Sequence, residues 1–278
     1  MISKENLQTY YEVTRTLIRD INYAYLLPHP TLRNLISNYT ITFPAKGVMS
    51  EEYTILPHGC ATLVLSYDGN KTTSSLFGPM TKPVCVGSEA NLSKLLFIVE
   101  FQPAGYYAFS GIPQKELTNC NCSFEHINPP LHNLFVQNLE NATDICSLVN
   151  GIDQLFLAYL KTSIYRPEFT GANHIILESG GQVSVKELSH NLYYSERHLG
   201  RIFDQYLGIS VKSFSRLVRI NKAMRLLKHP NHSVTQVYLT AGFYDMPHFI
   251  HEFKSICEIT PQKYRDKMSD FYSEVAKF

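Results

Sequence analysis

Two stretches of the C-terminal third, 185–214 and 234–264, repeat one pattern of apolar and polar positions. In each stretch a polar residue precedes apolar residues at helical spacing, and after a short turn a second polar residue precedes another such run. The aligned positions are Ser195 with Asp245, His198 with His248, Leu199 with Phe249, and Phe203 with Phe253. The repeat therefore predicts two short pairs of helices on one chain.

The polar residues at the predicted helix starts have the chemistry of caps. The expected capping boxes pair Ser184 with Glu187 and Ser233 with Gln236, and the expected N-caps of the second helices are Ser195 and Asp245. Ser210 opens a longer helix that runs to Lys228, and Thr260 with Pro261 opens a last short one. Gly242 stands in the second turn, where a left-handed backbone is expected.

Each predicted helix pair has enough apolar residues for a small core. These residues are Val185, Leu188, Leu192, Leu199, Ile202 and Phe203 in the first pair, and Val234, Val237, Leu239, Ala241, Phe249 and Phe253 in the second. Two short helices with a tight turn form a helix-turn-helix, whose second helix fits the major groove of DNA. We interpret His198 and His248, which stand beside core positions, as packing or cap-region residues and not as ligands.

Arginines mark the exposed face of the second helix in the first pair. Arg197 and Arg201 are four positions apart and therefore share a face with Gly200 and Asp204. Two guanidiniums on one groove-facing stripe suit bidentate contact with guanine. A solvated helix face is the alternative for such a stripe considered alone, but the duplication and the caps favour DNA contact.

The N-terminal half mixes helical and strand patterns. Residues 4–20 have the spacing of an amphipathic helix, while segments rich in β-branched and aromatic residues predict strands at 39–43, 61–67, 84–86 and 95–101. Helical patterns return at 104–110, 129–139 and 151–164. We therefore expect an α+β chain with a domain at 1–162, a linker at 163–172 that contains Pro167 and Gly171, and an all-helical domain at 173–270.

Charge and cysteine content bear on the partner and the compartment. The net charge of +1 hides an asymmetry, since residues 172–278 hold 14 Lys+Arg against 10 Asp+Glu and seven of the 11 histidines. A basic C-terminal third suits a phosphate-backbone partner. The six scattered cysteines suit a reducing cytoplasm, and neither a membrane-spanning run nor a signal peptide is expected.

Other kinds of functional site have little support in the sequence. Cys120, Cys122 and His126 are too few for a structural zinc site, and the chain has no glycine-rich phosphate loop and no nucleophile-elbow motif. We therefore expect no enzyme activity, no metal and no cofactor. Candidates for an apolar effector pocket are His58, Phe101, Tyr106 and Tyr107.

The region from Leu188 to Tyr264 resembles the DNA-binding domain of AraC-type transcription regulators. The resemblance rests on Ser195–Phe203, Gly208–Ser210, Arg219–Ala223, Ala241–Asp245, His248–Phe249, Glu252–Lys254 and Thr260–Arg265. It implies two helix-turn-helix units that are joined by the helix Ser210–Lys228 and enter successive major-groove segments on one face of DNA. The chain departs from the family pattern at Gly200, His251 and Glu258.

The resemblance also implies roles for individual residues. Arg197 and Arg201 would contact bases from the first unit, and Met246, Ile250 and His251 from the second. Ser195, Tyr244 and Lys254 would contact the DNA backbone.

The N-terminal half resembles, more loosely, a sensor domain of unassigned function that often precedes such DNA-binding domains. Its landmarks are Leu56–Gly59, Phe77–Pro79, Phe101–Gly105 and Gly111–Leu117. The resemblance implies a β-rich, barrel-like module with flanking helices that binds an effector or mediates dimerisation.

Together these observations predict a cytoplasmic regulator, activator or repressor, that binds double-stranded promoter DNA under control of an unidentified small-molecule effector. A homodimer would raise its avidity, RNA polymerase would be a partner of an activator, and no membrane is involved. Two alternatives stay open for the N-terminal domain: a ligand-free dimerisation scaffold, or a metal-binding or catalytic barrel fused to the DNA-binding domain.

Overall fold

The computed structural model describes residues 2–10, 14–44, 50–160 and 167–268. The N-terminal half is built on a seven-stranded antiparallel sheet within these residues. In spatial order the strands are β1 Thr16–Arg19, β2 Tyr23–Leu26, β3 Ile36–Thr42, β8 Leu95–Phe101, β5 Thr62–Tyr67, β6 Thr72–Phe77 and β9 Asn121–Ser123. A separate two-stranded ribbon pairs β4 Thr54–Ile55 with β7 Val84–Cys85.

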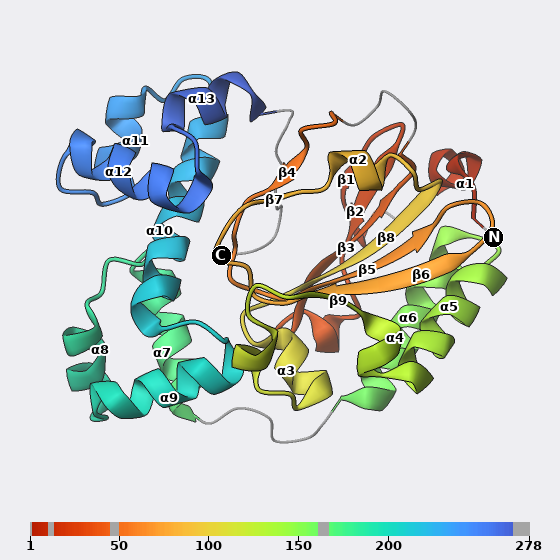
Figure 1. The fold of residues 1–278 in the computed structure, drawn as a ribbon, viewed down its shortest axis with the longest axis horizontal. Coiled ribbons are helices and arrows are strands. Elements are labelled where there is room, and N and C mark those ends of the chain that lie inside the picture. The colour runs from red at the N-terminus through yellow and green to blue at the C-terminus, as the bar shows by residue number, and fades with distance from the viewer. Residues whose placement is uncertain (1, 11–13, 45–49, 161–166, 269–278) are drawn as a thin grey trace.

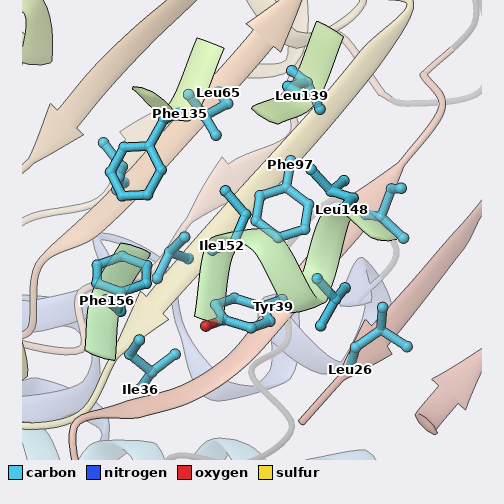
Figure 2. Packing of buried hydrophobic residues seen from close by; sticks show 14 of the residues in the cluster. Leu26, Ile36, Tyr39, Leu65, Phe97, Phe135, Leu139, Leu148, Ile152 and Phe156 are labelled. Carbon is cyan, nitrogen blue, oxygen red and sulfur yellow. The ribbon is translucent and has the colours of Figure 1, made fainter. Parts of the chain in front are cut away.

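Short helices and two longer ones accompany this sheet (Figure 1). They are α1 Lys4–Thr9, η1 Pro30–Leu32, α2 Gly87–Ala90, α3 Gly105–Ser110, η2 Gln114–Leu117, α4 Phe124–Ile127, α5 Pro129–Asn141 and α6 Ile145–Tyr159. The longer helices, α5 and α6, lie against one face of the sheet. The core lies between them and β3, β5 and β8, where Tyr39, Phe97, Phe135 and Phe156 are fully buried (Figure 2).

A buried carboxylate joins α6 to the sheet. Asp153 accepts hydrogen bonds from the Tyr39 hydroxyl, at 2.8 Å, and from the Arg15 guanidinium. Burial, and then the neighbouring Asp153 carboxylate, raises the pKa of Tyr39. A buried carboxylate costs free energy unless it is paired and hydrogen-bonded, and here both partners are present.

The C-terminal half is helical. Its elements are α7 Pro167–Glu178, α8 Val185–Leu192, α9 Glu196–Tyr206, α10 Val211–Lys228, α11 Val234–Thr240, α12 Met246–Cys257 and α13 Pro261–Asp266. Figure 1 shows α10 running between one group of helices, α7 to α9, and a second group, α11 to α13. A second core unites both groups, with Phe203, Phe214, Phe249 and Phe253 fully buried.

The expected α+β architecture is confirmed, with two differences in detail. The sheet is open and not a closed barrel, because β1 and β9 form its edges and do not pair with each other in the described part of the chain. Residues 4–20 do not form one helix: α1 ends at Thr9, and Thr16–Arg19 pairs with β2. The β-branched residues Thr16 and Ile18 complete a sheet edge there, so tertiary pairing outweighs the local helical spacing.

The predicted linker at 163–172 is helical in its second part. Residues 163–166 lie outside the described residues, whereas Pro167 begins α7. Proline is favourable in the first turn of a helix, so this Pro starts an element instead of interrupting one.

Candidate nucleic-acid interface

The first helix-turn-helix unit consists of α8, a short turn and α9. The Ser184–Glu187 capping box is present in both directions, and the Ser195 hydroxyl accepts a hydrogen bond from the His198 amide at 3.2 Å. These caps were predicted and are confirmed. Each satisfies amide groups that a helix start would leave without a partner, so both helix starts are fixed by local chemistry.

Helix α9 exposes a polar stripe opposite its buried face. A hollow of about 690 Å³, here called the α9 hollow, is lined by Ser195, Arg197, His198, Gly200, Arg201 and Asp204. Arg197 and Arg201 are both exposed, and a Cβ atom added at Gly200 would meet no neighbouring atom within 4 Å. The structure therefore brings both predicted base-contacting arginines together on one open helix face.

His198 connects Arg201 to a carboxylate on α7. The Arg201 guanidinium lies 3.4 Å from Nδ1 of His198, and Nε2 of the same ring lies 3.4 Å from the Glu168 carboxylate on α7. The Tyr194 ring stacks on this imidazole with ring centroids 5.0 Å apart. His198 is thus a packing and orienting residue, in agreement with the interpretation of its sequence position.

The second unit, α11 and α12, repeats this local chemistry. Its capping box pairs Ser233 with Gln236, and the Asp245 carboxylate accepts a hydrogen bond from the His248 amide at 2.7 Å. Gly242 has a φ of 81°, as the turn was expected to require. One core prediction is wrong, because Leu239 is 59% exposed.

The predicted DNA-contacting residues of the second unit differ in exposure. Ile250, His251, Lys254 and Tyr244 are exposed, and Tyr244 is 91% accessible. Met246 is only partly accessible, because it packs against the C-terminal core. On α12 this unit exposes Lys254 and two histidines, His248 and His251, in contrast to the two exposed arginines on α9.

Two arginines of α10 hold the units together. Arg216 donates to both carboxylate oxygens of Glu252 on α12, at 2.7 and 3.1 Å. Arg219 donates to the Gly181 carbonyl beside the first unit at 2.7 Å, and its guanidinium carbon lies 5.4 Å from the ring centroid of Phe243 in the second. Bidentate arginine–carboxylate pairs have well-defined geometry, so these contacts fix how the two units are oriented.

The N-terminal half contacts the first unit directly. Lys115 Nζ lies 3.0 Å from an Asp204 carboxylate oxygen, and the Thr118 hydroxyl donates to the Gly208 carbonyl at 2.7 Å. Gln205 donates to the Tyr107 hydroxyl at 2.9 Å. Helix α9 therefore has three sides: one in the core, one open to solvent and one against the sheet domain.

The four residues expected to line an effector pocket have different packing neighbours. Phe101 and Tyr106 pack within the N-terminal core, with ring centroids 5.4 Å apart. The Tyr107 ring lies against Tyr206 of α9 at 4.7 Å, and His58 is buried in the turn before Cys60, where its Nδ1 accepts the Cys60 amide. These side chains take part in core packing and in contact between the two halves of the chain, and their role in binding an effector stays a prediction.

The described residues bear on metal binding and on membrane insertion. Within the described ranges no group of three or more His, Cys, Asp or Glu side chains is placed to hold a metal ion, and this includes the surroundings of Cys120 and Cys122. None of the helices in those ranges is at once long enough and apolar enough to cross a membrane.

Sequence reasoning missed three features of this surface. Tyr193 has a φ of 58° and is 93% exposed, although left-handed backbone is rare for bulky residues. The bridging position of Arg219 and the Lys115–Asp204 pair both depend on contacts between distant segments. No sequence signal indicates those two contacts, whereas the aromatic pairs Tyr193–Tyr194 and Phe243–Tyr244 could have drawn attention to the turns.

Comparison with family models agrees with the division seen in the fold. A model described as a helix-turn-helix domain matches residues 188–267. A second, described as a domain of unknown function (DUF6597), matches residues 25–123.

Curated relatives are similar over part of the chain. An uncharacterized HTH-type transcriptional regulator of Haemophilus influenzae is 25% identical over 156 residues, which are 50% of this chain and 52% of that protein. The HTH-type transcriptional regulator ArgR of Pseudomonas aeruginosa is 29% identical over 85 residues, 31% of this chain and 26% of that one. The chain thus spans about half of the first relative's length and about a quarter of the second's.

Solved structures give similar matches. A transcriptional regulator with an AraC-type DNA-binding domain from Chromobacterium violaceum is 29% identical, with a TM-score of 0.34, and the match covers 36% of this chain and 91% of that one. ToxT from Vibrio cholerae is 10% identical, with a TM-score of 0.43, over 82% of this chain and 98% of that one.

Proposed function

Residues 188–267 form an AraC-type helix-turn-helix domain, and on that premise we propose that the chain is a sequence-specific, non-enzymatic regulator of transcription. Its partner is double-stranded promoter DNA. The observation that carries the proposal is the pair of capped helix-turn-helix units, one of which presents Arg197 and Arg201 on an open face.

The exposed side chains suit two kinds of DNA contact. Arg197 and Arg201 would contact base edges from α9. From α12 the contacts would come from Ile250, His251 and the accessible part of Met246. Arginine can bind guanine through two hydrogen bonds, which fixes a base identity. Ser195, Tyr244 and Lys254 would contact backbone phosphates through their hydroxyl and ammonium groups and set the register.

The contacts of α10 support binding by both units at once. Arg216 and Arg219 fix the orientation of the units, so α9 and α12 would meet two major-groove segments without further ordering. Successive segments on one face of DNA are about 34 Å apart. A pre-organised pair loses less conformational entropy on binding than two independently mobile units would.

The sheet domain is the regulatory part of this proposal. We place the boundary between the domains, expected at 163–172, in the connection of α6 to α7. A small-molecule effector or a second copy of the chain would bind the sheet domain and shift the population of domain arrangements. Contacts such as the hydrogen bond from Thr118 to Gly208 would transmit this change to α9. The protein would then act in the cytoplasm as an activator or a repressor. An activator would have RNA polymerase as a further partner.

Replacing Arg201 with alanine tests the proposal. The probe is a labelled duplex selected from a random oligonucleotide pool by the wild-type chain, and binding is followed by fluorescence anisotropy. Loss of one bidentate base contact costs about 1–3 kcal/mol, so affinity falls roughly 5- to 150-fold and base preference relaxes at one position. Arg33→Ala, which removes an exposed arginine of the sheet domain, is the matched control and leaves affinity unchanged.

Two results would count against the proposal. If Arg201→Ala binds the selected duplex as tightly and as selectively as the wild type, the assignment of base contacts is wrong. If the wild-type chain itself shows no salt-sensitive binding to any duplex, the DNA-binding function is wrong as well.

A further inference from the structure

A carboxylate lies on the same face of α9 as the two arginines. Asp204 follows Arg197 and Arg201 along one helical stripe and lines the α9 hollow with them. A bare carboxylate at this position would repel the phosphates of a duplex that enters the hollow. The stripe is thus well suited to DNA only where the charge of Asp204 is neutralised.

The cation that neutralises Asp204 comes from the other domain. Lys115 lies in η2, within the sheet domain, and its ammonium group is 3.0 Å from the Asp204 carboxylate. Both side chains are solvent-accessible, at 68% and 41%. Exposed ion pairs of this kind contribute little to folding stability, so stability alone gives a weak reason for this pair.

The approach of Lys115 depends on how the domains are arranged. Element η2 is held against α9 by the hydrogen bond from Thr118 to the Gly208 carbonyl. The fit is close, since a Cβ atom at Gly208 would lie 2.6 Å from the Gln114 carbonyl oxygen. Any movement of the sheet domain away from α9 would therefore withdraw Lys115 from Asp204.

We infer that Lys115, although it lies in the sheet domain, is part of the DNA-binding surface, where it neutralises Asp204 at the end of the arginine stripe. Withdrawal of the sheet domain leaves Asp204 bare and weakens DNA binding electrostatically. The inference rests on the proposed DNA-binding function and adds a physical link between domain arrangement and affinity. Its ligand is the phosphate backbone of duplex DNA, so the effect is the same for every base sequence.

A double-mutant cycle on the full chain tests the inference. The variants are Lys115→Met, Asp204→Asn and the two combined, and the probes are the duplex selected by the wild type and a duplex of unrelated sequence. One unneutralised charge near the phosphates lowers affinity about 3- to 10-fold at low salt, so Lys115→Met weakens binding to both duplexes by that factor. Asp204→Asn binds at least as tightly as the wild type, and adding it to Lys115→Met restores affinity.

Two further variants separate charge from other causes. Lys71→Met removes a lysine from the β5–β6 turn of the same domain and leaves binding unchanged. Lys115→Arg keeps the positive charge and keeps wild-type affinity. The thermal midpoint of every variant stays near that of the wild type, because the pair is exposed.

The cycle has outcomes that overturn the inference. If Lys115→Met binds like the wild type, Lys115 is not part of the surface. If the loss persists when Asp204→Asn is added, Lys115 acts on its own and not through Asp204. If Asp204→Asn alone weakens binding, Asp204 contacts the DNA directly. All three require that the wild type binds the duplex, so a failure of the proposed function is recognised separately by its lack of binding.

Discussion

The substitution Gly200→Ala should change the stability of α9 and its binding to DNA in opposite directions. Gly200 lies in the middle of α9, and a Cβ atom there would have no neighbouring atom within 4 Å. Glycine in a helix interior costs about 0.5–1 kcal/mol relative to alanine, because its unfolded chain is more flexible. Since the added methyl group meets no obstacle, we expect Gly200→Ala to recover this amount in full.

The gain is large enough to measure. For a domain of roughly 100 residues, 1 kcal/mol shifts the midpoint of thermal unfolding by about 4–8 °C. We expect the midpoint temperature for unfolding of the C-terminal half to rise by about 2–8 °C, as followed by the circular dichroism of the helices. A lower midpoint would show that the site is more crowded than the structure indicates.

DNA binding should change in the opposite direction. The new methyl group projects into the α9 hollow, between Arg197 and Arg201, where a base edge would approach. We expect weaker binding to the selected duplex and unchanged binding to a duplex of unrelated sequence, both measured by anisotropy. A more stable variant with unchanged selectivity would refute the placement of DNA against this face of α9.

Three further predictions concern stability and reactivity. Hydrogen bonding, first of all from the Ser147 amide, lowers the pKa of Asp144, so this N-cap stabilises the fold above the ordinary pKa of 3.8 and loses its effect as the pH falls through the lowered value. Asp144→Ala should therefore lower the free energy of unfolding in urea by about 1 kcal/mol at pH 7, with a difference that shrinks as the pH falls below the ordinary pKa of 3.8. Gly208 has a φ of 78°, and an added Cβ atom would lie 2.6 Å from the Gln114 carbonyl oxygen, so Gly208→Ala should lower the urea midpoint of unfolding. Gly200→Ala should raise the same midpoint, and a shift of both variants in one direction would contradict the reasoning. Burial raises the pKa of Cys257, so in native protein at pH 8 iodoacetamide should label the exposed Cys85 and Cys120 first, and early labelling of Cys257 in peptide mass spectra would show that it is accessible.

Features that act within a few residues could be predicted from the sequence. The caps at Ser195 and Asp245 bond amides three positions away, so residue type and spacing are sufficient to recognise them. The same holds for the pairing of Arg197 with Arg201, because the helical period places both on one face. Where a cap or a helical period decides the structure, the expected element is the one observed.

Features that depend on distant segments could not be predicted in this way. Strand β6, Thr72–Phe77, was missed because its threonines and serines carry little apolar alternation, and its pairing with β5 and β9 stabilises it. Residues 16–19 are the opposite case, because their spacing predicted a helix and they form the edge strand β1. Leu239 is exposed because the packing of the second unit, and not its helical period, decides which face is covered.

Two capped helix pairs, their joining helix and an arginine stripe follow from the order of the residues, because these features arise from interactions between near neighbours along the chain. The surroundings of that stripe depend on the packing of distant segments. Lys115 and Asp204 are 89 positions apart, and Arg219 meets both units only after α10 has packed between them. Such contacts depend on how whole elements pack, and packing is a property of the complete core and not of any local pattern.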